Sequence, residues 1–413
     1  MVGRSASDDA RGRPAIPRSY NPPDPLPHLV AAFDKFRGTA TAAEVARAAA
    51  AGARASGWSA DELPLADGGE GTLDALSRAL GGERRRTVVR GPLGEPVDAE
   101  WLYVPEGLQR FPEHARRLLS HRPDRAAGPV AVIEAALAVG RALLPVPRGD
   151  DPVRARTDGV GDLILAARAA GARLVVVGVG GSATTDGGWG ALSALGGSAP
   201  TDGGWGALSA LGGPRRFDGP ELVVAFDVST PFRLAAPTFA PQKGATPAQV
   251  GALTTCLDVL ARRYRDELGV DVDRLEGAGA AGGLAGGLAA LGARLVPGIA
   301  LVADLVELDR RVAAADLVAT GEGRLDATSF AGKVVGGVLA AAGGSPRALC
   351  IAGQIETGVE HHWAGRQGRV EALSLVATVG EARALQATTQ CVFDAVAATC
   401  RRHRPSRPQL PSS

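Results

Sequence analysis

Short apolar segments alternate with alanine-rich segments of helical character along most of this chain, and the alternation restricts the folds open to it. Several apolar segments are β-branched and have no polar face, as expected of strands that helices cover on both sides. The pattern predicts an α/β fold with a largely parallel sheet, and 413 residues allow two or three domains. The predicted strands are 28–33, 130–137, 174–180, 222–228, 317–320 and 348–352.

Two helices have clear N-terminal signals. Residues 41–44 (TAAE) have the spacing of a capping box, and residues 246–249 (TPAQ) add proline at the first helical position. These signals predict helices that end near residue 55 and at residue 268.

A tandem repeat interrupts the otherwise ordinary pattern. Residues 182–197 and 198–213 are two 16-residue copies that differ only at Thr184 and Pro200. Repeat architectures have longer periods and at least three units, so we interpret this pair as a recent duplication. We expect the first copy to keep the native place, because the predicted strand 174–180 leads directly into it, and the second copy to bulge outward.

Lysine is rare in this chain. Only three of its 45 lysine and arginine residues are lysines, namely Lys35, Lys243 and Lys333. Arginine can replace lysine where only a solvated positive charge is needed, but not where a compact ammonium group must fit a tight site. All three lysines stand in glycine-flanked, loop-like contexts, and we predict a site role for at least two of them.

Composition excludes several classes of function. The net charge is +1 and aromatic residues make up 4% of the chain, so neither a nucleic-acid groove nor an anionic membrane surface is indicated. The longest weakly polar run, 277–292, is too short to span a bilayer, and the four cysteines have no metal-site spacing. Residues 1–27 lack the apolar core of a secretory signal. We expect a cytoplasmic protein with a disordered leader, 1–27, and a disordered tail, 401–413.

Four loops combine glycine with carboxylates or further glycines. They are 66–72, 185–188, 277–283 and 321–326. Glycine lets backbone N–H groups converge on an anion, and the carboxylates can hold Mg²⁺ or accept a proton from a hydroxyl group. Such loops suit phosphoryl transfer, in which catalysis consists mainly of positioning and charge neutralisation.

Two better-known nucleotide motifs fit poorly. Residues 178–183 match a dinucleotide fingerprint loosely, but no acidic residue follows where the ribose would need one, so an NAD-linked dehydrogenase is only a weak alternative. A Walker A loop is absent, because Val334 follows Lys333 and Ala327 stands where glycine is required. Any ATP site is therefore of another kind.

The order of the motifs from about 28 to 355 resembles the type-1 glycerate kinase family. The segments that carry the resemblance are DKFRGTATAAEVA (34–46), LPLADGGEGTLDAL (63–76), GPLGEPV (91–97), VGVGGSATTDGG (177–188), FAPQKGA (239–245), GAGAAGGLAGGLAALGARLVPGI (277–299) and ATGEGRLD with GKVVGGV (319–338). The resemblance implies phosphorylation of D-glycerate by ATP with Mg²⁺, usually to 2-phosphoglycerate. It also implies a flavodoxin-like domain from 28–90 and 290–400, an inserted α/β domain from 91–289, and an active site in the cleft between them.

Site roles carried over from the resemblance are hypotheses. Asp186 would be the catalytic base, although both Asp186 and Asp67 could simply be turn or N-cap residues. The other implied roles are Lys35 and Arg37 in catalysis, on the glycerate carboxylate or the transferred phosphoryl group; Asp67, Glu70 and Lys243 in substrate binding; Gly279, Gly282, Gly283 and Lys333 in binding the ATP phosphates; and Glu322 and Asp326 as metal ligands.

Two departures from the family pattern bear on activity. Phe33 stands where the family has proline, and the repeat adds 16 residues beside Asp186. The alternative to a kinase is therefore a catalytically impaired protein of the same fold that binds a small acid or a nucleotide. The expected partners are small molecules only, and a homodimer is left open.

Overall fold

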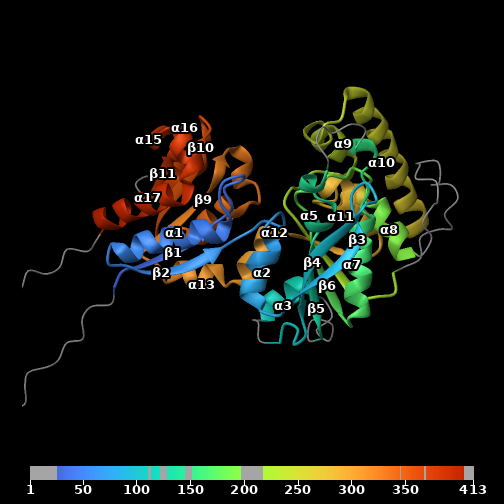
Figure 1. The fold of residues 1–413 in the computed structure, drawn as a ribbon, viewed down its shortest axis with the longest axis horizontal. Helices are drawn as coiled ribbons and strands as arrows, with labels where there is room; N and C mark the ends of the chain where they lie inside the picture. The colour runs from blue at the N-terminus through green and yellow to red at the C-terminus, as the bar shows by residue number, and fades with distance from the viewer. Residues whose placement is uncertain are drawn as a thin grey trace, which may run out of the picture.

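The computed structural model describes residues 26–109, 113–120, 128–144, 151–196, 217–344, 346–366 and 369–403. It contains two α/β domains that lie side by side, each built on one sheet (Figure 1). The predicted α/β class with largely parallel sheets is confirmed. Most of the predicted leader and tail, 1–25 and 404–413, lies outside the described residues, but helix α17 (Thr388–Arg402) continues into the first residues assigned to the tail.

The first domain has a five-stranded parallel sheet in the order β11-β10-β9-β1-β2. This is the flavodoxin-like order, in which the chain leaves the first strand to one side and later returns to the other. The strands are β1 (His28–Phe33), β2 (Ser59–Pro64), β9 (Leu317–Leu325), β10 (Arg347–Ile355) and β11 (Val370–Ser374).

Helices cover both faces of this sheet, as the apolar sequence of β1 requires. Leu29 and Phe33 pack in the core beneath helix α1 (Ala42–Ala55) and α17, while Val30 and Ala32 face the opposite side. The remaining helices of this half are α12 (Gly298–Leu305), α13 (Leu308–Ala313), α14 (Val334–Ala342), α15 (Leu375–Val379) and α16 (Glu381–Gln386), with the 3₁₀ segments η7 (Ala327–Phe330) and η8 (Val359–Arg366).

The second domain has a six-stranded mixed sheet in the order β3-β4-β5-β6-β7-β8. Its first two strands run antiparallel to their neighbours, and the last four are parallel. The strands are β3 (Glu83–Arg90), β4 (Pro96–Val104), β5 (Val130–Glu134), β6 (Leu174–Gly178), β7 (Glu221–Phe226) and β8 (Arg294–Pro297). Strands β3 and β8 therefore pair in the second sheet, although the predicted boundaries at 90/91 and 289/290 assigned both to the first domain. These boundaries were misplaced because the chain crosses over directly after β2 and returns only after β8.

The helices of the second domain lie on both faces of its sheet. They are α2 (Thr72–Leu80), α3 (Glu113–Leu119), α5 (Ala136–Val139), α6 (Asp151–Arg154), α7 (Asp158–Ala169), α8 (Trp189–Gly196), α9 (Ala235–Phe239), α10 (Pro247–Leu268) and α11 (Leu284–Ala290), with 3₁₀ segments η1 (Arg141–Leu143), η3 (Phe232–Leu234), η4 (Pro241–Lys243), η5 (Val272–Arg274) and η6 (Ala280–Gly283). Both predicted capping boxes, at Thr41 and Thr246, are confirmed, and α10 ends at Leu268 as predicted.

One apolar core extends through both domains. It joins Val30 of β1 and Val318 of β9 to Val132 of β5 and Val223 of β7, with Val302 of α12 between the sheets. The chain crosses between the domains at close backbone contacts: a Cβ on Gly298 would lie 2.1 Å from the carbonyl oxygen of Asp67. The domains therefore meet over packed surface, and the loops at this junction have little freedom to move.

Candidate active site

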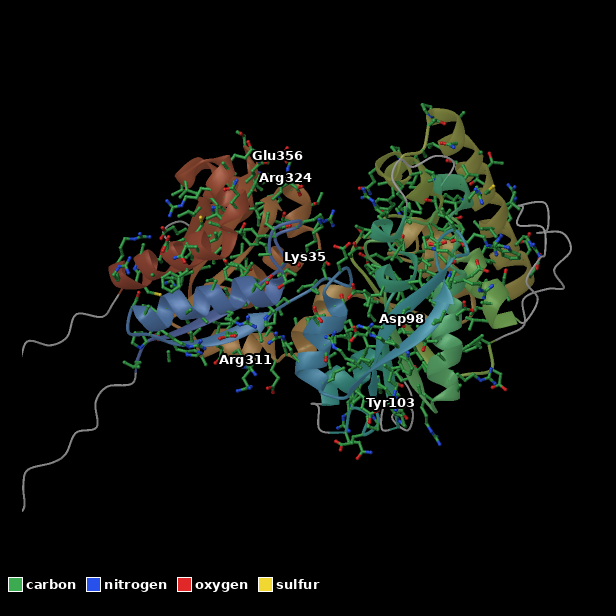
Figure 2. The ribbon with its side chains drawn as sticks, viewed as in Figure 1. Lys35, Asp98, Tyr103, Arg311, Arg324 and Glu356 are labelled. Carbon is green, nitrogen blue, oxygen red and sulfur yellow. The ribbon has the colours of Figure 1, made fainter. Side chains whose placement is uncertain are left out.

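The carboxyl ends of parallel strands from both domains converge at the junction. In the first sheet the chain leaves β1 toward β2 on one side and reaches β9 and β10 on the other, so the boundary of β1 and β9 is a topological switch point, where open α/β sheets bind ligands. Asp34 and Lys35 follow β1, and Glu322 lies near the end of β9. Lys35 lies at the side of its domain that faces the other domain (Figure 2).

A cavity of about 560 Å³ opens at this junction. The first domain and the α2 loop contribute Arg37, Thr328, Lys333 and Glu70. The second domain contributes the rest of the lining: Arg141, Ala142, Gly180, Gly181, Ser182, Asp227, Val228, Phe239, Gln242, Lys243, Ala281 and Gly282. The predicted residues Arg37, Glu70, Lys243, Gly282 and Lys333 thus lie around one hollow, although they come from distant parts of the sequence.

Four carboxylates with mutual electrostatic influence lie at this junction: Asp34, Asp67, Asp227 and Glu322, which we call the carboxylate group. The pKa of Asp34 is raised to about 6, mainly by burial and also by the neighbouring charge of Asp67, against the opposing effect of Lys35. Burial and Asp67 likewise raise the pKa of Asp227 to about 6. The pKa of Glu322 is raised to about 7, again mainly by burial, with repulsion from Asp34 and Asp67 added. Such pKa values are typical of groups that exchange protons or bind cations near neutral pH.

The carboxylate group suits Mg²⁺. The Glu322 Oε1 atom is buried without a hydrogen-bond partner among the described residues, so an acceptor oxygen is left unsatisfied. No three acidic, histidine or cysteine residues in the described part of the chain form a metal cage by themselves. Mg²⁺ is usually held by one or two carboxylates together with substrate phosphates and water, so these donors fit it without a full protein cage.

Lys35 and Glu134 hold the loop that carries Asp67 and Glu70. The Lys35 Nζ atom donates to the carbonyl oxygen of Glu70 at 2.9 Å and lies 3.8 Å from Asp34 Oδ1. From the other domain, the buried Glu134 carboxylate accepts hydrogen bonds from the backbone N–H groups of Gly71 (3.1 Å) and Leu73 (3.0 Å) at the start of α2. The loop is therefore fixed from both sides.

Lys243 is buried in the cavity wall. Its Nζ atom donates to the carbonyl oxygen of Thr184 and lies 3.4 Å from the Ser182 hydroxyl oxygen. The pKa of Lys243 is lowered to about 7, mainly by burial and also by the nearby charge of Arg141, while Asp186 and Asp227 oppose the shift. An anion in the cavity would favour the charged ammonium form.

Lys333 and Asp326 lie on one turn but have different roles. The Lys333 Nζ atom donates to Thr328 Oγ1 at 3.0 Å at the start of α14, and both side chains line the cavity. The Asp326 carboxylate instead caps η7 and accepts from Thr328 N at 2.8 Å and Thr328 Oγ1 at 2.6 Å. Partial burial would raise the pKa of Asp326, but these hydrogen bonds and Lys333 lower it overall. Because Asp326 Oδ1 is already engaged by both Thr328 donors, the structure does not favour Asp326 as a metal ligand.

The structure places Asp186 outside the cavity lining. Its Oδ2 atom accepts from Thr157 N (2.9 Å), Thr157 Oγ1 (2.8 Å) and Gly190 N (2.9 Å), and Oδ1 accepts from Gly188 N (3.1 Å). Burial raises the pKa of Asp186 against these hydrogen bonds. Its oxygens are engaged in fixing α7 and the start of α8. The expectation that Asp186 is the base is therefore not supported by this geometry, which matches the N-cap alternative.

Only one of the three predicted phosphate-binding glycines lines the cavity. Gly282, at φ +67°, lies so close to Thr184 that a Cβ would meet its carbonyl oxygen at 2.1 Å. Gly279 packs against Thr230 and Pro231, and Gly283 packs against Gly187. The missing side chains of Gly279 and Gly283 permit close contacts within the protein, and their N–H groups donate to the carbonyl oxygens of Thr230 and Gly279, respectively.

Sequence reasoning missed Asp227, Arg141, Ser182 and Phe239. Asp227 had a usable signal, because it follows a buried apolar strand as Asp34 does. Gly180, which belongs to the loose dinucleotide match, has a packing role. A Cβ on this residue would lie 2.4 Å from the Cα atom of Gly69, so only glycine permits this close approach.

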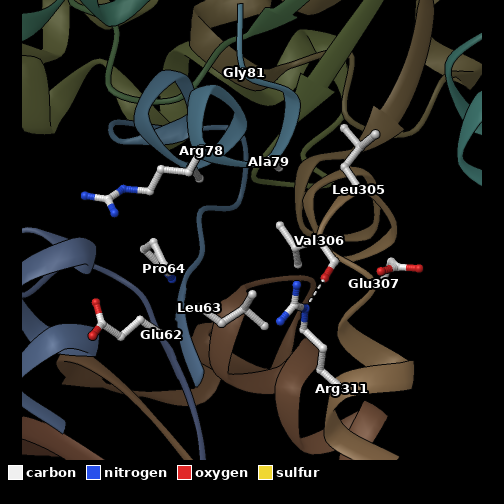
Figure 3. A pocket seen from close by; sticks show the side chains of 11 residues that line it. Glu62, Leu63, Pro64, Arg78, Ala79, Gly81, Leu305, Val306, Glu307 and Arg311 are labelled. Carbon is white, nitrogen blue, oxygen red and sulfur yellow. Dashed lines mark hydrogen bonds between the residues drawn. The ribbon is translucent and has the colours of Figure 1, made fainter. Parts of the chain in front are cut away.

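A second cavity, of about 910 Å³, lies between β2, α2 and the α12–α13 turn (Figure 3). Three of the four charged residues that line it form ion pairs, namely Glu62 with Arg54, Arg311 with Asp61, and Glu307 with Arg310. None of the predicted site residues lines it. We therefore place the chemistry at the smaller cavity, where the loops of both domains meet.

The flavodoxin-like sheet, the second α/β domain and a junction rich in carboxylates and cations define a two-domain α/β enzyme of the kinase class. The model of the glycerate kinase family matches residues 29–196 and 213–403. The chain belongs to the glycerate kinase family. The unmatched residues, 197–212, are sixteen in number, the length of one repeat copy, and the second copy (198–213) lies almost wholly within them. That copy lies outside the described residues, whereas the first copy supplies α8.

Named relatives agree with this family assignment. A glycerate kinase of Halalkalibacterium halodurans is 38% identical over 352 residues, which cover 80% of this chain and 87% of the relative. The glycerate 2-kinase of Escherichia coli K12 is 36% identical over 328 residues, or 75% and 80% of the two chains. A crystal structure assigned as glycerate kinase 2 from Salmonella typhimurium LT2 matches with a TM-score of 0.67 at 33% identity, covering 92% of this chain and all of that one. No described helix is long and apolar enough to cross a membrane.

Proposed function

We propose that this protein transfers the γ-phosphoryl group of ATP to a hydroxyl group of D-glycerate and forms 2-phosphoglycerate. Family membership supports the reaction class. The observation that carries the proposal is that Asp227, Lys243 and Lys333 line one interdomain cavity. The other members of the carboxylate group and Lys35 do not line it, but they lie close enough to share electrostatic interactions at the same junction. Phosphoryl transfer needs this combination, because phosphates require positive charge while a hydroxyl nucleophile requires a proton acceptor.

Glu322 and Asp67 would hold Mg²⁺. When bound, the ion would neutralise charge on the nucleotide phosphates. Glu322 offers an unsatisfied buried oxygen, and the two carboxylates influence each other's charge at the junction.

Asp227 replaces Asp186 as our candidate base. It lines the cavity, follows β7 directly and has a pKa raised to about 6 by burial and by Asp67. A carboxylate with such a pKa can accept the proton of the glycerate hydroxyl group at neutral pH. Glu70, which also lines the cavity, would accept a hydrogen bond from a glycerate hydroxyl group.

We assign different cationic side chains to the two ligands, D-glycerate and ATP. Arg37 and Lys35 lie on the side of the first domain and would bind the glycerate carboxylate, and Lys333 with Thr328 would bind the transferred phosphoryl group. Lys243, Arg141 and the Gly181–Ser182 turn would bind the phosphate chain of ATP from the second domain.

The test is a coupled assay of ADP release with D-glycerate and Mg-ATP, with ³¹P NMR of the product. We expect ADP release that depends on D-glycerate, and a phosphorus resonance coupled to the C2 proton. ADP release that does not depend on glycerate would contradict the proposal, and a product phosphorylated at C3 would contradict the assigned hydroxyl.

A protein that binds its ligands without turnover is the second candidate, because the repeat lies directly after α8. Calorimetric binding of D-glycerate or ATP without ADP release, with activity gained on deleting 198–213, would favour this candidate.

A further inference from the structure

Charged side chains line the active-site cavity on both sides. Arg37, Glu70 and Lys333 supply them on one side, and Arg141, Asp227 and Lys243 on the side of the second domain. The second domain also supplies an apolar wall, made of Phe239, Val228 and small residues such as Ala281, and Gln242 adds an amide. D-glycerate has three carbons, each bearing oxygen, and has no apolar surface for such a wall. The apolar wall therefore fits a different part of the reactants.

Phe239 is the one aromatic side chain among the described residues that line the cavity. It ends α9 and is half-buried against the core beneath α10. The turn η4 follows at once, with Lys243 N donating to Ala240 O at 3.0 Å. The aromatic ring and the Lys243 ammonium group are thus fixed four residues apart on one short turn, and both face the same hollow.

We propose that the base of the nucleotide stacks on Phe239, next to Val228 and Ala281, with its edge within reach of the Gln242 amide. The phosphate chain then runs past Lys243 and Ser182 toward the carboxylate group. Aromatic rings are effective platforms for nucleobases, and a glutamine amide can both donate to and accept from a base edge. This inference rests on the proposed function and specifies which domain holds the nucleoside.

The alternative aromatic platform lies on the first domain. The Phe330 and His362 rings stack with centroids 4.3 Å apart and planes at 9°, and Trp363 lies 5.6 Å from Phe330. These rings already occupy one another's faces, and none of them lines the cavity. They provide a matched control.

The test compares two probes on the full-length chain by isothermal titration calorimetry with Mg²⁺ present: ATP, and inorganic tripolyphosphate, which has no base. We expect Phe239→Ala to raise the Kd for ATP about five- to a hundredfold, the range typical of one lost base–aromatic stack. The Kd for tripolyphosphate should stay unchanged, which also shows that the variant is folded. Phe239→Tyr should restore ATP binding, and His362→Ala should change neither affinity.

An unchanged Kd for ATP in Phe239→Ala would overturn the inference. Equal weakening of both probes would overturn it too, because the loss would then not concern the base. Weakening of ATP binding by His362→Ala alone would move the base to the first domain. Failure of the proposed function has a separate signature: the unaltered protein would bind neither probe, and Lys243→Ala would have no effect on either.

Discussion

At the scale of single residues, Asp227 is the side chain on which the proposed chemistry most depends. We expect Asp227→Asn to lower kcat at least about a hundredfold, because the amide cannot accept the hydroxyl proton. Steady-state ADP release measures the change. The control is Glu381→Gln, an exposed carboxylate on α16, which should leave kcat unchanged. A near-normal kcat in Asp227→Asn would remove Asp227 from the role of base.

For Asp186 we predict a loss of stability with little change in kcat. Backbone N–H groups now donate to both oxygens of the Asp186 carboxylate. In Asp186→Asn one of these oxygens becomes an NH₂ group, which cannot accept. The buried donors left without an acceptor would cost about 1–3 kcal/mol of stability. We expect a lower free energy of unfolding by urea denaturation, with kcat at low temperature changed only a few-fold. Loss of kcat at full stability would return Asp186 to the catalytic role that the sequence suggested.

The contrast between Asp227 and Asp186 shows which site residues the sequence alone can predict. Lysine scarcity predicted Lys35, Lys243 and Lys333, and all three lie at the junction. The predicted role of Asp186 in TDGG is not supported by its geometry, because spacing does not tell which side of a loop a carboxylate faces. That direction depends on Thr157 of α7, which is distant in sequence and donates twice to Asp186.

At the scale of elements, the buried Glu134 carboxylate of the second domain is one of the two groups that hold the loop 67–71, with Lys35 as the other. We expect Glu134→Ala to lower kcat/KM about tenfold or more, because Gly71 and Leu73 lose their acceptor and Asp67 and Glu70 lose their fixed positions. Glu134→Gln retains one carbonyl acceptor and should recover part of the loss. If Glu134→Ala lowered the free energy of unfolding but left kcat and KM unchanged, Glu134 would have a structural role only.

The second repeat copy is the other element with a testable role. The first copy already supplies the turn at Asp186 and helix α8, and the family model matches the chain up to residue 196. Since long insertions in loops cost little, we expect deletion of 198–213 to change kcat by no more than about twofold. A tenfold or greater gain in kcat on deletion would instead support the impaired-protein alternative.

At the scale of the whole molecule, the two-domain α/β architecture followed from the sequence but its boundaries did not. Strand β3 contains three consecutive arginines and β2 contains Asp61 and Glu62, so neither has the apolar run that identified β1. Both are edge strands, where exposed polar side chains are tolerated. Pairing of β3 with β4 and of β8 with β7, which no local pattern encodes, assigns β3 and β8 to the second sheet.

The buried charges at the junction also make stability depend on pH. Asp34, Asp227 and Glu322 have folded pKa values raised above their ordinary ones, so between about pH 4 and 7 the folded state binds more protons than the unfolded state. Their contribution to the free energy of unfolding is present at low pH and is lost as pH rises through the folded pKa values. Lys243 affects stability above this range. Because folding lowers its pKa from 10.5 to about 7, its contribution to the free energy of unfolding grows as pH rises from about 7 toward 10.5. The ligand-free protein should therefore have a local minimum of stability near pH 7.

Glu322→Gln isolates one part of this dependence. The Glu322 pKa rises from 4.5 to about 7 on folding, which corresponds to a loss on the order of 3 kcal/mol between pH 4.5 and 8. We expect the unfolding free energy of the unaltered protein, measured by urea denaturation at each pH, to fall relative to that of Glu322→Gln by about this amount across the interval. Glu381→Gln, the exposed control, should follow the unaltered protein throughout. If the difference between the unaltered protein and Glu322→Gln did not change with pH, Glu322 would be charged in the ligand-free cavity, and the case for it as a vacant cation ligand would lose its electrostatic basis.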